Sequence, residues 1–397
     1  MAGLAAGRAL VDVGRSVALL EARERIGGRA CTVAAEDLWF DLGCHWFHSA
    51  DRNPLVPLAR ALGFEVDEYA VLWAKPWNLR KLGPKGEDLA RAFERLGEAM
   101  AATLGGRDPA LAELIAKTGG EWQGFVTAAY TWSSGALAAE LSSHDLAQGQ
   151  EIQVNWRTPS GLGRFTERFG EALPLRRNAP VERLGLTPNG VEATGPFGRV
   201  EAKAAIVAVP VSILATERLR FEPGLPEGHR RALAGLPLGH NEKLFFRIEG
   251  EPFGPPKDFQ ANFAYDRVET AHYHIHEFGR PTVEAYFGGP LAKRLASEGQ
   301  AALAAFALDE LAGEFGGTVR RHLRPIASTA WSVDPWLEGA YSYALPGVAG
   351  ARAVLAEPID GRLFFAGEAT SVAHAASLNG AYESGRRAAQ EVLASLR

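Results

Sequence analysis

The stretch MAGLAAGRALVDVGRSVALLEARERIGGRA, residues 1–30, decides the fold class. Its alanines favour a helix that ends near Gly14, and the apolar run SVALLE after it is typical of a short buried strand. In a G-x-G-x-x-G fingerprint, the third glycine allows close helix–strand packing, and an acidic residue about 20 positions later binds a ribose. Gly3 and Glu21 have this relation, so the stretch predicts a dinucleotide-binding fold.

Two residues alone also fit an ordinary helix–turn–strand with a surface glutamate. The adjacent Gly27 and Gly28 favour the nucleotide interpretation, since they permit close backbone approach to a ligand, and Arg29 can pair with a phosphate. Met1 then stands inside the glycine loop. We therefore expect the true start to lie upstream, with roughly ten to twenty residues supplying one strand and the first two glycines. Natural truncation is the alternative.

Composition bounds the class of protein. The chain has 397 residues, 47% apolar and 22% charged, which suits a globular protein with two domains. A net charge of −5 indicates no nucleic-acid-binding face. The longest apolar run, AAIVAVPVSILA, is too short to span a bilayer. The two cysteines, Cys31 and Cys44, are expected to be free thiols. We expect a cytoplasmic protein, on the condition that Met1 is close to the true start.

Strand and helix patterns divide the chain into alternating blocks. Strands are expected in 180–202, 204–210, 242–248, 282–288 and 362–369, and helices over much of 71–150 and in 301–315 and 380–396. The run AAIVAVP is typical of a parallel strand that is covered on both faces. Nucleotide-type segments thus bracket two inserted segments. We predict one discontinuous domain from 1–70, 151–215 and 326–397, and a substrate-binding domain from 71–150 and 216–325.

Five stretches, in order, resemble the flavin-containing amine oxidase family, which includes monoamine oxidases, polyamine oxidases and lysine-specific histone demethylases. They are LLEARERIGGRACT with DLGCHWFH (19–48), PVERLGL (180–186), GHNEKLFFRI (239–248), WSVDPWLEGAYSYALPG (331–347) and LFFAGEATS with SLNGAYESGRRAA (363–389). The resemblance covers nearly the whole chain. The SLNG and GAYSY segments are closest to the polyamine oxidase and demethylase branch.

The resemblance implies an α/β fold with an FAD-binding Rossmann-like domain of the glutathione reductase type and a discontinuous α+β substrate-binding domain. It implies that FAD oxidises a primary or secondary amine (a mono-, di- or polyamine) to an imine. The imine is hydrolysed to an aldehyde or ketone, and oxygen is reduced to hydrogen peroxide. Ala340 stands where monoamine oxidases carry a flavin-linked cysteine, so FAD is expected to be bound non-covalently.

The resemblance also assigns residues to the cofactor. Glu21 corresponds to the residue that binds the adenosine ribose, and Glu368 to one that meets the ribitol or diphosphate. Ser377 and Leu378 present backbone to the pyrimidine edge of the flavin. The full set of expected cofactor residues is Gly3, Glu21, Ala22, Arg23, Gly28, Arg29, Gly43, Val181, Trp331, Gly367, Glu368, Ser377, Leu378 and Ala381.

Catalytic and substrate residues are implied in the same way. The expected catalytic residues are Lys243, Tyr341 and Trp336, and His45, His48 and Tyr343 are expected at the substrate. Strand alternation places Lys243 opposite to Leu244 and Phe246, so a lysine facing the flavin could hold a water near its reactive nitrogen. Solvated lysine, packing aromatics and satisfied turn histidines are the alternatives at these positions.

One further pattern is AHYHIHEFG, in which His272, His274 and His276 share a face of an extended chain. Three imidazoles can bind a transition metal, but no carboxylate or cysteine pattern supports one, and we favour an exposed edge strand without metal. Two other functions stay open: a desaturase or protoporphyrinogen-type oxidase on the same fold, and a non-catalytic relative that has lost FAD. Oligomeric state is open, a homodimer included.

Overall fold

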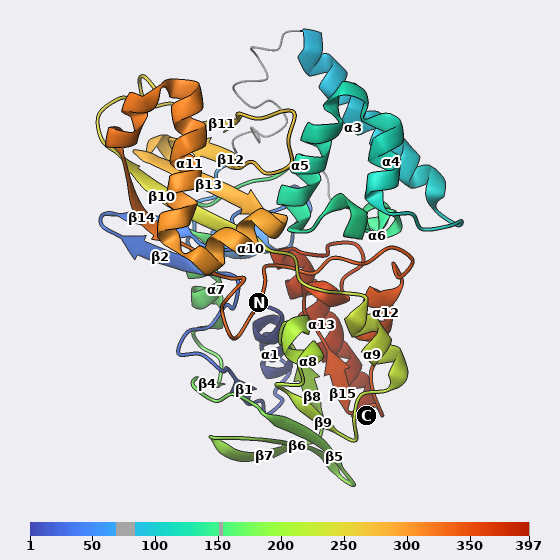
Figure 1. Cartoon of the computed structure of the whole chain (residues 1–397). Coiled ribbons are helices and arrows are strands. Elements are labelled where there is room, and N and C mark those ends of the chain that lie inside the picture. The colour runs from blue at the N-terminus through green and yellow to red at the C-terminus, as the bar shows by residue number, and fades with distance from the viewer. Residues whose placement is uncertain (69–83, 151–153, 397) are drawn as a thin grey trace. The chain divides into compact units, whose positions relative to one another are not determined.

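The computed structural model describes residues 1–68, 84–150 and 154–396, drawn in Figure 1. Main-chain contacts divide the chain into two compact units. Unit 1 comprises Met1–Tyr69, Gln148–Pro237 and Val348–Arg397. Unit 2 comprises Ala70–Ala147 and Leu238–Gly347.

These bounds differ from the predicted domains in two segments. Residues 216–237 lie in unit 1, because helix α9 (Glu227–Ala234) packs against α12 (Ala351–Ala356). Residues 326–347 lie in unit 2, where strand β14 (Leu323–Ser328) pairs with β10 (Asn241–Ile248). The assignment of FAD to one domain and substrate to the other stays a prediction.

In the described part of unit 1, three pairs of strands run parallel, and two of these pairs form two-stranded sheets of their own. Strand β1 (Leu19–Leu20) pairs with β4 (Leu175–Arg176), and β15 (Leu363–Phe365) pairs with β8 (Ala205–Val207). The parallel strand predicted from AAIVAVP is therefore confirmed. Phe364 and Phe365 are each 1% exposed, which shows that β15 is covered on both faces.

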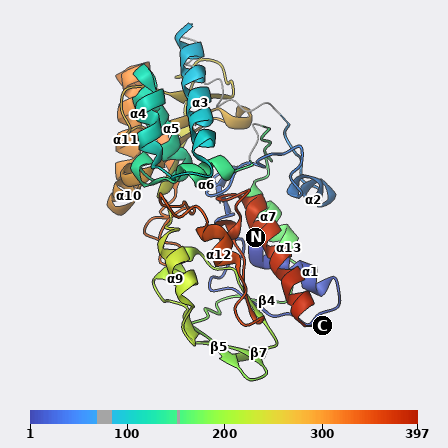
Figure 2. The same cartoon turned by 90° about the vertical axis from the view of Figure 1, so that its right-hand side faces the viewer.

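Helices α1 (Ala2–Val11) and α13 (Leu378–Ser395) of unit 1 pack against each other, as Figure 2 shows. A Cβ at Gly385 would lie 2.2 Å from the carbonyl oxygen of Ala2, so glycine permits this close approach. Gly3 was expected to serve close helix–strand packing. A Cβ there would lie 3.6 Å from Ala208 Cβ, an ordinary contact, so the packing does not require that glycine.

The rest of unit 1 is built from a mixed four-stranded sheet, one antiparallel hairpin and short helices. A sheet of order β7-β6-β5-β9 contains the predicted strands of 180–202. Its members are β5 (Arg183–Thr187), β6 (Gly190–Gly195), β7 (Gly198–Ala202) and β9 (Arg220–Glu222). The hairpin β2 (Thr32–Ala35) and β3 (Leu38–Asp41) was not predicted. Helices α2 (Leu55–Ala61), α7 (Leu162–Gly170) and α8 (Val211–Ala215) complete this list, with the 3-10 helix η6 (Glu368–Thr370).

Unit 2 is organised around a five-stranded antiparallel sheet of order β11-β12-β13-β10-β14. Besides β10 and β14 it contains β11 (Phe259–Asn262), β12 (His272–Ile275) and β13 (Thr282–Gly288). One face is apolar: Leu244, Val283 and their neighbours pack into a core with α10 (Gly289–Glu298) and α11 (Gln300–Phe315), which are labelled beside the sheet in Figure 1.

The opposite face of this sheet is polar, and the strand register aligns its side chains in two rows. One row reads Lys243, Tyr286, His272, Asn262, and the other reads Phe245, Glu284, His274, Gln260. Adjacent strands lie about 4.8 Å apart, so neighbours in a row are in side-chain reach. We call these eight residues the polar sheet face.

Helices fill the remainder of unit 2. As predicted, the described part of 71–150 is mainly helical, with α3 (Pro84–Thr103), α4 (Leu111–Thr118), α5 (Gln123–Ser134) and α6 (Ser143–Gln148); residues 71–83 lie outside the described part. Four 3-10 helices are η2 (Gly120–Trp122), η3 (Ala138–Glu140), η4 (Glu277–Gly279) and η5 (Gly317–His322). In the described ranges, no helix of either unit combines the length and apolar character that crossing a membrane requires.

Candidate active site

The expected cofactor residues of unit 1 gather where its parallel strands end. Glu21 directly follows β1, and Gly367 and Glu368 come just after β15. Ligands of open α/β folds bind beyond the carboxyl ends of parallel strands. The Glu21 carboxylate accepts a hydrogen bond from the Arg23 amide at 2.9 Å, which fixes the turn containing Ala22. This is the position at which a ribose-binding carboxylate is expected.

An ion pair connects the early part of the chain to its last motif. Arg29 Nη1 donates to Glu368 Oε1 at 3.0 Å, and the Ala376 amide donates to the other carboxylate oxygen at 3.1 Å. Glu368 is buried. The Gly367 amide donates to Ser384 Oγ at 2.9 Å, which ties the same loop to α13. The structure thus brings together residues that the sequence separates by more than three hundred positions.

The start of α13 is built by side-chain capping. Ser377 is its N-cap, and Ser377 Oγ accepts from the Gly380 amide at 3.0 Å while donating to the His374 carbonyl at 2.7 Å. The Ser377 hydroxyl is therefore engaged with its own loop. The contact of the Ser377 and Leu378 backbone with a flavin stays a prediction.

Glycines in unit 1 serve two different purposes. A Cβ at Gly43 would lie 1.6 Å from the Arg29 carbonyl oxygen, so the chain's own backbone requires glycine there. Gly28 has φ of +60° and open space around its Cβ position. Gly28 therefore fits a ligand lying against the backbone. Gly3 at the start of α1, Ala381 in α13 and Val181 before β5 belong to the same unit.

This donor set fits FAD. Glu21 offers a carboxylate to ribose hydroxyls, Arg29 a guanidinium to phosphate, Gly28 an open backbone, and α1 and α13 their positive ends. The assignment of these residues to the adenosine and diphosphate portions stays a prediction.

In unit 2 the central residue is Lys243, on the polar sheet face. It is 5% exposed, and its Nζ lies 3.2 Å from Glu284 Oε1 and 5.9 Å from the centroid of the Phe245 ring. Leu244 and Phe246 are fully buried in the core on the other face, so the predicted alternation is confirmed. The alternative of a solvated strand lysine is wrong.

Tyr341 is joined to the same face by a hydroxyl chain. Tyr286 OH lies 2.7 Å from Tyr341 OH, and Tyr341 OH donates to the Trp132 carbonyl at 3.2 Å. Tyr286 is directly opposite Lys243 in the strand register. Burial, with Tyr341 beside it, raises the pKa of Tyr286 well above its ordinary value, so its hydroxyl stays protonated. The sequence analysis missed Glu284 and Tyr286, although alternation in TVEAYFG was a signal for both.

The other expected aromatics differ in burial. Trp331 is 8% exposed, whereas Trp336 is 37% exposed. The Trp336 amide donates a hydrogen bond to Asp334 Oδ1 at 2.8 Å. The catalytic role of Trp336 stays a prediction. Tyr343 packs against the helical core of α3–α6, and burial raises its pKa to about 12, with Glu140 adding to the shift.

The histidines near the glycine segment lie in unit 1. His48 Nδ1 is 2.8 Å from Asn155 Oδ1, and the ring centroids of His45 and Trp46 are 5.2 Å apart. His48 therefore has the polar partner that the alternative of a satisfied turn histidine requires. The predicted substrate role of both histidines stays a prediction.

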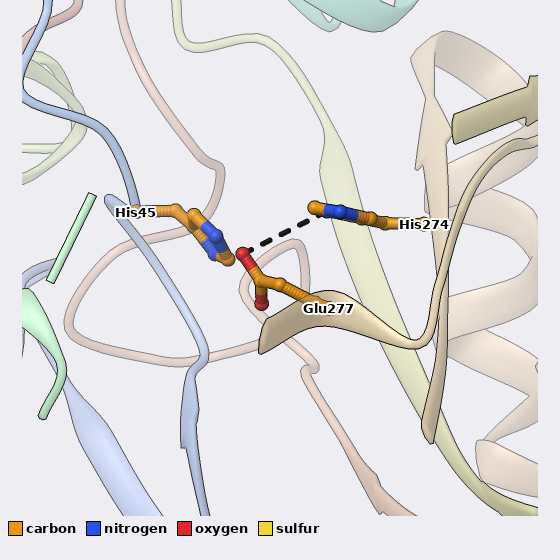
Figure 3. Close-up of side chains that lie close together, drawn as sticks. All are labelled: His45, His274 and Glu277. Atoms are coloured by element: carbon orange, nitrogen blue, oxygen red, sulfur yellow. Dashed lines mark ion pairs between the residues drawn. The ribbon is translucent and has the colours of Figure 1, made fainter. Parts of the chain in front are cut away.

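The three-histidine strand was misjudged. Strand β12 lies between β11 and β13, and His274 and His276 are buried, so the expected exposed edge strand is wrong. His272 pairs with Asn262 at 2.8 Å and His276 with the Arg280 carbonyl at 3.0 Å. His274 meets Asp258 at 2.6 Å and Glu277 at 3.7 Å, the ion pair drawn in Figure 3. The prediction of an exposed strand failed because polar side chains on the polar sheet face are buried.

Residues that fit FAD beyond the ends of parallel strands, together with a buried lysine on a separate sheet, suit a flavin-dependent oxidoreductase. The chain belongs to the family described as flavin containing amine oxidoreductase, whose profile matches residues 1–393. Polyamine oxidase 3 of Oryza sativa subsp. japonica is 28% identical, over 98% of this chain and 87% of that protein. The lysine-specific histone demethylase 1 homolog 2 of Arabidopsis thaliana is 28% identical, over 99% of this chain and 57% of that protein.

Solved structures show the same fold. Cyclohexylamine oxidase from Brevibacterium oxydans IH-35A has a TM-score of 0.77 and 22% identity, with 100% of this chain and 97% of that one covered. A triple mutant of putrescine oxidase has a TM-score of 0.81 and 21% identity, with 99% and 96% covered. The predicted family, its polyamine oxidase and demethylase branch, the α/β FAD-binding fold, the FAD cofactor and the oxidation of amines are confirmed. The protein is an FAD-dependent amine oxidoreductase.

Proposed function

We propose that this enzyme oxidises a linear di- or polyamine and passes the electrons to oxygen. A primary or secondary CH–NH group becomes an imine, and water hydrolyses the imine to an aldehyde or ketone and a free amine or ammonia. Oxygen takes up the two electrons and two protons as hydrogen peroxide. The observation that carries the proposal is the buried Lys243–Glu284 pair on the polar sheet face.

The substrate class is supported by charge. Glu284, Asp258 and Glu277 lie at or beside the polar sheet face, with Lys243 and His274 as their basic neighbours. A partly enclosed surface rich in carboxylates favours a substrate with several ammonium groups. The names of the relatives agree, since polyamine oxidases and a putrescine oxidase are among them. These substrates are named for the relatives, and they support di- and polyamines as substrates of this enzyme by analogy.

FAD, when bound, supplies the two-electron acceptor for the amine carbon. The chain's own residues orient the substrate and handle protons. Lys243 holds a water or a proton where the amine carbon reacts, and Glu284 fixes the Lys243 Nζ. Tyr341, held by Tyr286, is proposed to contact the substrate, and Trp336 and Tyr343 of the same unit are proposed as further contacts. His45 and His48 are proposed separately as substrate residues.

We propose non-covalent FAD binding, because the Ala340 methyl group offers no atom for a thioether. Glu21, Arg23, Arg29 and Glu368 contact its polar portions in this proposal. We also propose a cytoplasmic location, which the free thiols of Cys31 and Cys44 support, since reducing compartments keep cysteines unpaired.

The test is peroxide release from purified, flavin-loaded enzyme with spermidine, 1,4-diaminobutane, butylamine and 1-butanol. We expect turnover in the order polyamine or diamine above butylamine, no turnover of 1-butanol, and one peroxide per aldehyde. Butylamine equal to the diamine would contradict the substrate class. If none of the amines is oxidised, the desaturase and the non-catalytic alternatives are favoured instead.

A further inference from the structure

Glu242, the residue before Lys243, has a carboxylate that the proposed chemistry does not use. It is fully buried, and strand alternation points it to the apolar side of the sheet, opposite to Lys243. Burial raises its pKa above the ordinary value, while hydrogen bonds from Thr329, Ser332 and Trp331 oppose the shift. In the described part of the chain, no lysine, arginine or histidine forms an ion pair with Glu242. Burying a carboxylate at a core position costs free energy unless its oxygens are hydrogen-bonded, so the hydrogen-bond partners of Glu242 matter.

Those contacts converge on one turn. Glu242 Oε2 accepts from Thr329 Oγ1 at 2.5 Å and from the Trp331 amide at 3.0 Å, and Oε1 accepts from the Ser332 amide at 2.8 Å. Both carboxylate oxygens are therefore engaged with the segment that follows β14. Strand β14 ends at Ser328, so these amides have lost their strand partners and Glu242 takes the place of the missing strand.

The same turn is hydrogen-bonded to the main chain of Lys243. The Lys243 amide donates to Thr329 Oγ1 at 2.7 Å, and the Thr329 amide donates to the Lys243 carbonyl at 2.9 Å. Thr329 Oγ1 thus accepts from Lys243 and donates to Glu242. The main chain of Lys243 and the turn that carries Trp331 are locked to each other through one carboxylate and one hydroxyl.

We propose that Glu242 is a positioning residue, which, together with Thr329, fixes the main chain of Lys243 relative to the Trp331 turn. It acts from the far side of the strand and does not contact the substrate. A displacement of about 1 Å in a reacting group can lower the rate on the order of 10²-fold. Fixing the main chain of Lys243 prevents such a displacement. The inference rests on the proposed role of Lys243.

Three variants test it. Glu242→Gln keeps the shape but leaves one acceptor oxygen for donors on both sides. Thr329→Val removes the bridging hydroxyl, and Thr329→Ser keeps it. Glu310→Gln is the matched control, because Glu310 is another buried carboxylate of unit 2 and accepts from Arg267, the Ala271 amide and Tyr273 OH, all at 2.7–3.0 Å.

Two measurements are made on each variant: the rate of flavin reduction at saturating amine, and hydrogen exchange of peptides covering 241–248 and 329–337. We expect Glu242→Gln and Thr329→Val to slow reduction about tenfold or more, with substrate Kd changed less than threefold, and to speed exchange in both peptides. Thr329→Ser and Glu310→Gln should match wild type in rate. Thr329→Val decides the matter if Glu242→Gln does not fold.

A Lys243→Met background separates this inference from the role of Lys243. If Glu242 acts through Lys243, Thr329→Val costs clearly less in that background than in wild type. An equal loss in both backgrounds, or wild-type rates in both Thr329→Val and Glu242→Gln, overturns the inference. If Lys243→Met itself reduces and reoxidises normally, the proposed role of Lys243 fails instead.

Discussion

At the scale of single residues, two carboxylates surround the lysine from different directions. Glu284 meets the Lys243 side chain across the strand pair at 3.2 Å, and Glu242 reaches its main chain through Thr329. Lys243 could be predicted from the sequence, because alternation and the family motif agree on it. Glu284 was missed, although the alternation of its strand was a signal for it. Glu242 could not be predicted, since its position in the strand pattern fits a solvated charge equally well, and only the fold reveals that both glutamates are enclosed.

Lys243→Met keeps the length of the side chain and removes its ammonium. We predict that the variant retains FAD and that flavin reduction or reoxidation slows by about 10²-fold or more, the usual contribution of one acid–base group. Stopped-flow traces of both half-reactions measure this. Lys293→Met, at an exposed lysine of α10, is the matched control and should behave as wild type. Unchanged rates in Lys243→Met would remove Lys243 from the mechanism.

Glu284→Gln tests substrate selection. If the carboxylate favours an additional ammonium group, the ratio of kcat/KM for 1,4-diaminobutane to that for butylamine should fall about tenfold, which corresponds to roughly 1.4 kcal/mol. Comparing two substrates of one variant cancels any general effect on Lys243. Glu298→Gln, at the exposed end of α10, should leave the ratio unchanged. A ratio equal to that of wild type would show that selectivity lies elsewhere.

At the scale of elements, sequence reasoning worked where turns and alternation are strong. The strands of 180–202, β10 and β13 were found because turn residues or apolar alternation mark them. The hairpin of β2 and β3 was missed, since glutamate and aspartate interrupt its short apolar runs. Strand β12 was placed at an edge because its histidines look exposed; their burial depends on the cover over the polar sheet face, which the local sequence does not encode.

The covered polar face predicts an acid-sensitive fold. Burial lowers the pKa of His272 to about 3, with His274 adding to the shift. The unfolded chain takes up a proton below a pKa of about 6.5, and the folded state does not, so stability falls as pH drops from 6.5 towards 3. For His272 alone the free energy of unfolding should be about 2 kcal/mol lower at pH 5 than at pH 8.

Urea titrations of wild type and His272→Gln at pH 8 and pH 5 measure this contribution. Glutamine has no proton to take up in this range, so the variant should lose about 2 kcal/mol less between the two pH values. The control is His322→Gln, at a histidine on η5 near the surface. Equal pH dependence in wild type and His272→Gln would mean that His272 is protonated in the folded protein.

At the scale of the whole molecule, the residues that fit FAD and the buried lysine belong to two different units. Unit 1 carries the carboxylates, arginines and open glycine that fit FAD, and unit 2 carries the lysine and the polar sheet face. The family profile over residues 1–393 includes both, so both belong to one amine-oxidising enzyme. The order of motifs along the sequence was sufficient to predict this combination. The predicted domain boundaries at 215 and 325 were off, because strand pairing of β14 and packing of α9 are long-range contacts.

We propose that the amine, in its neutral form, delivers electrons to the bound flavin. The most direct measurement is anaerobic bleaching of the flavin absorbance near 450 nm by 1,4-diaminobutane and by 1,4-butanediol, followed from about pH 6 to 10. Free alkylamines are mostly protonated at pH 7, as the reference pKa of about 10.4 for lysine shows, and a protonated amine has no lone pair to assist the reaction. We predict bleaching by the diamine at a rate that rises with pH through one ionisation, and none by the diol. Equal bleaching by the diol, or no bleaching by any amine in a preparation that contains FAD, would contradict this proposal.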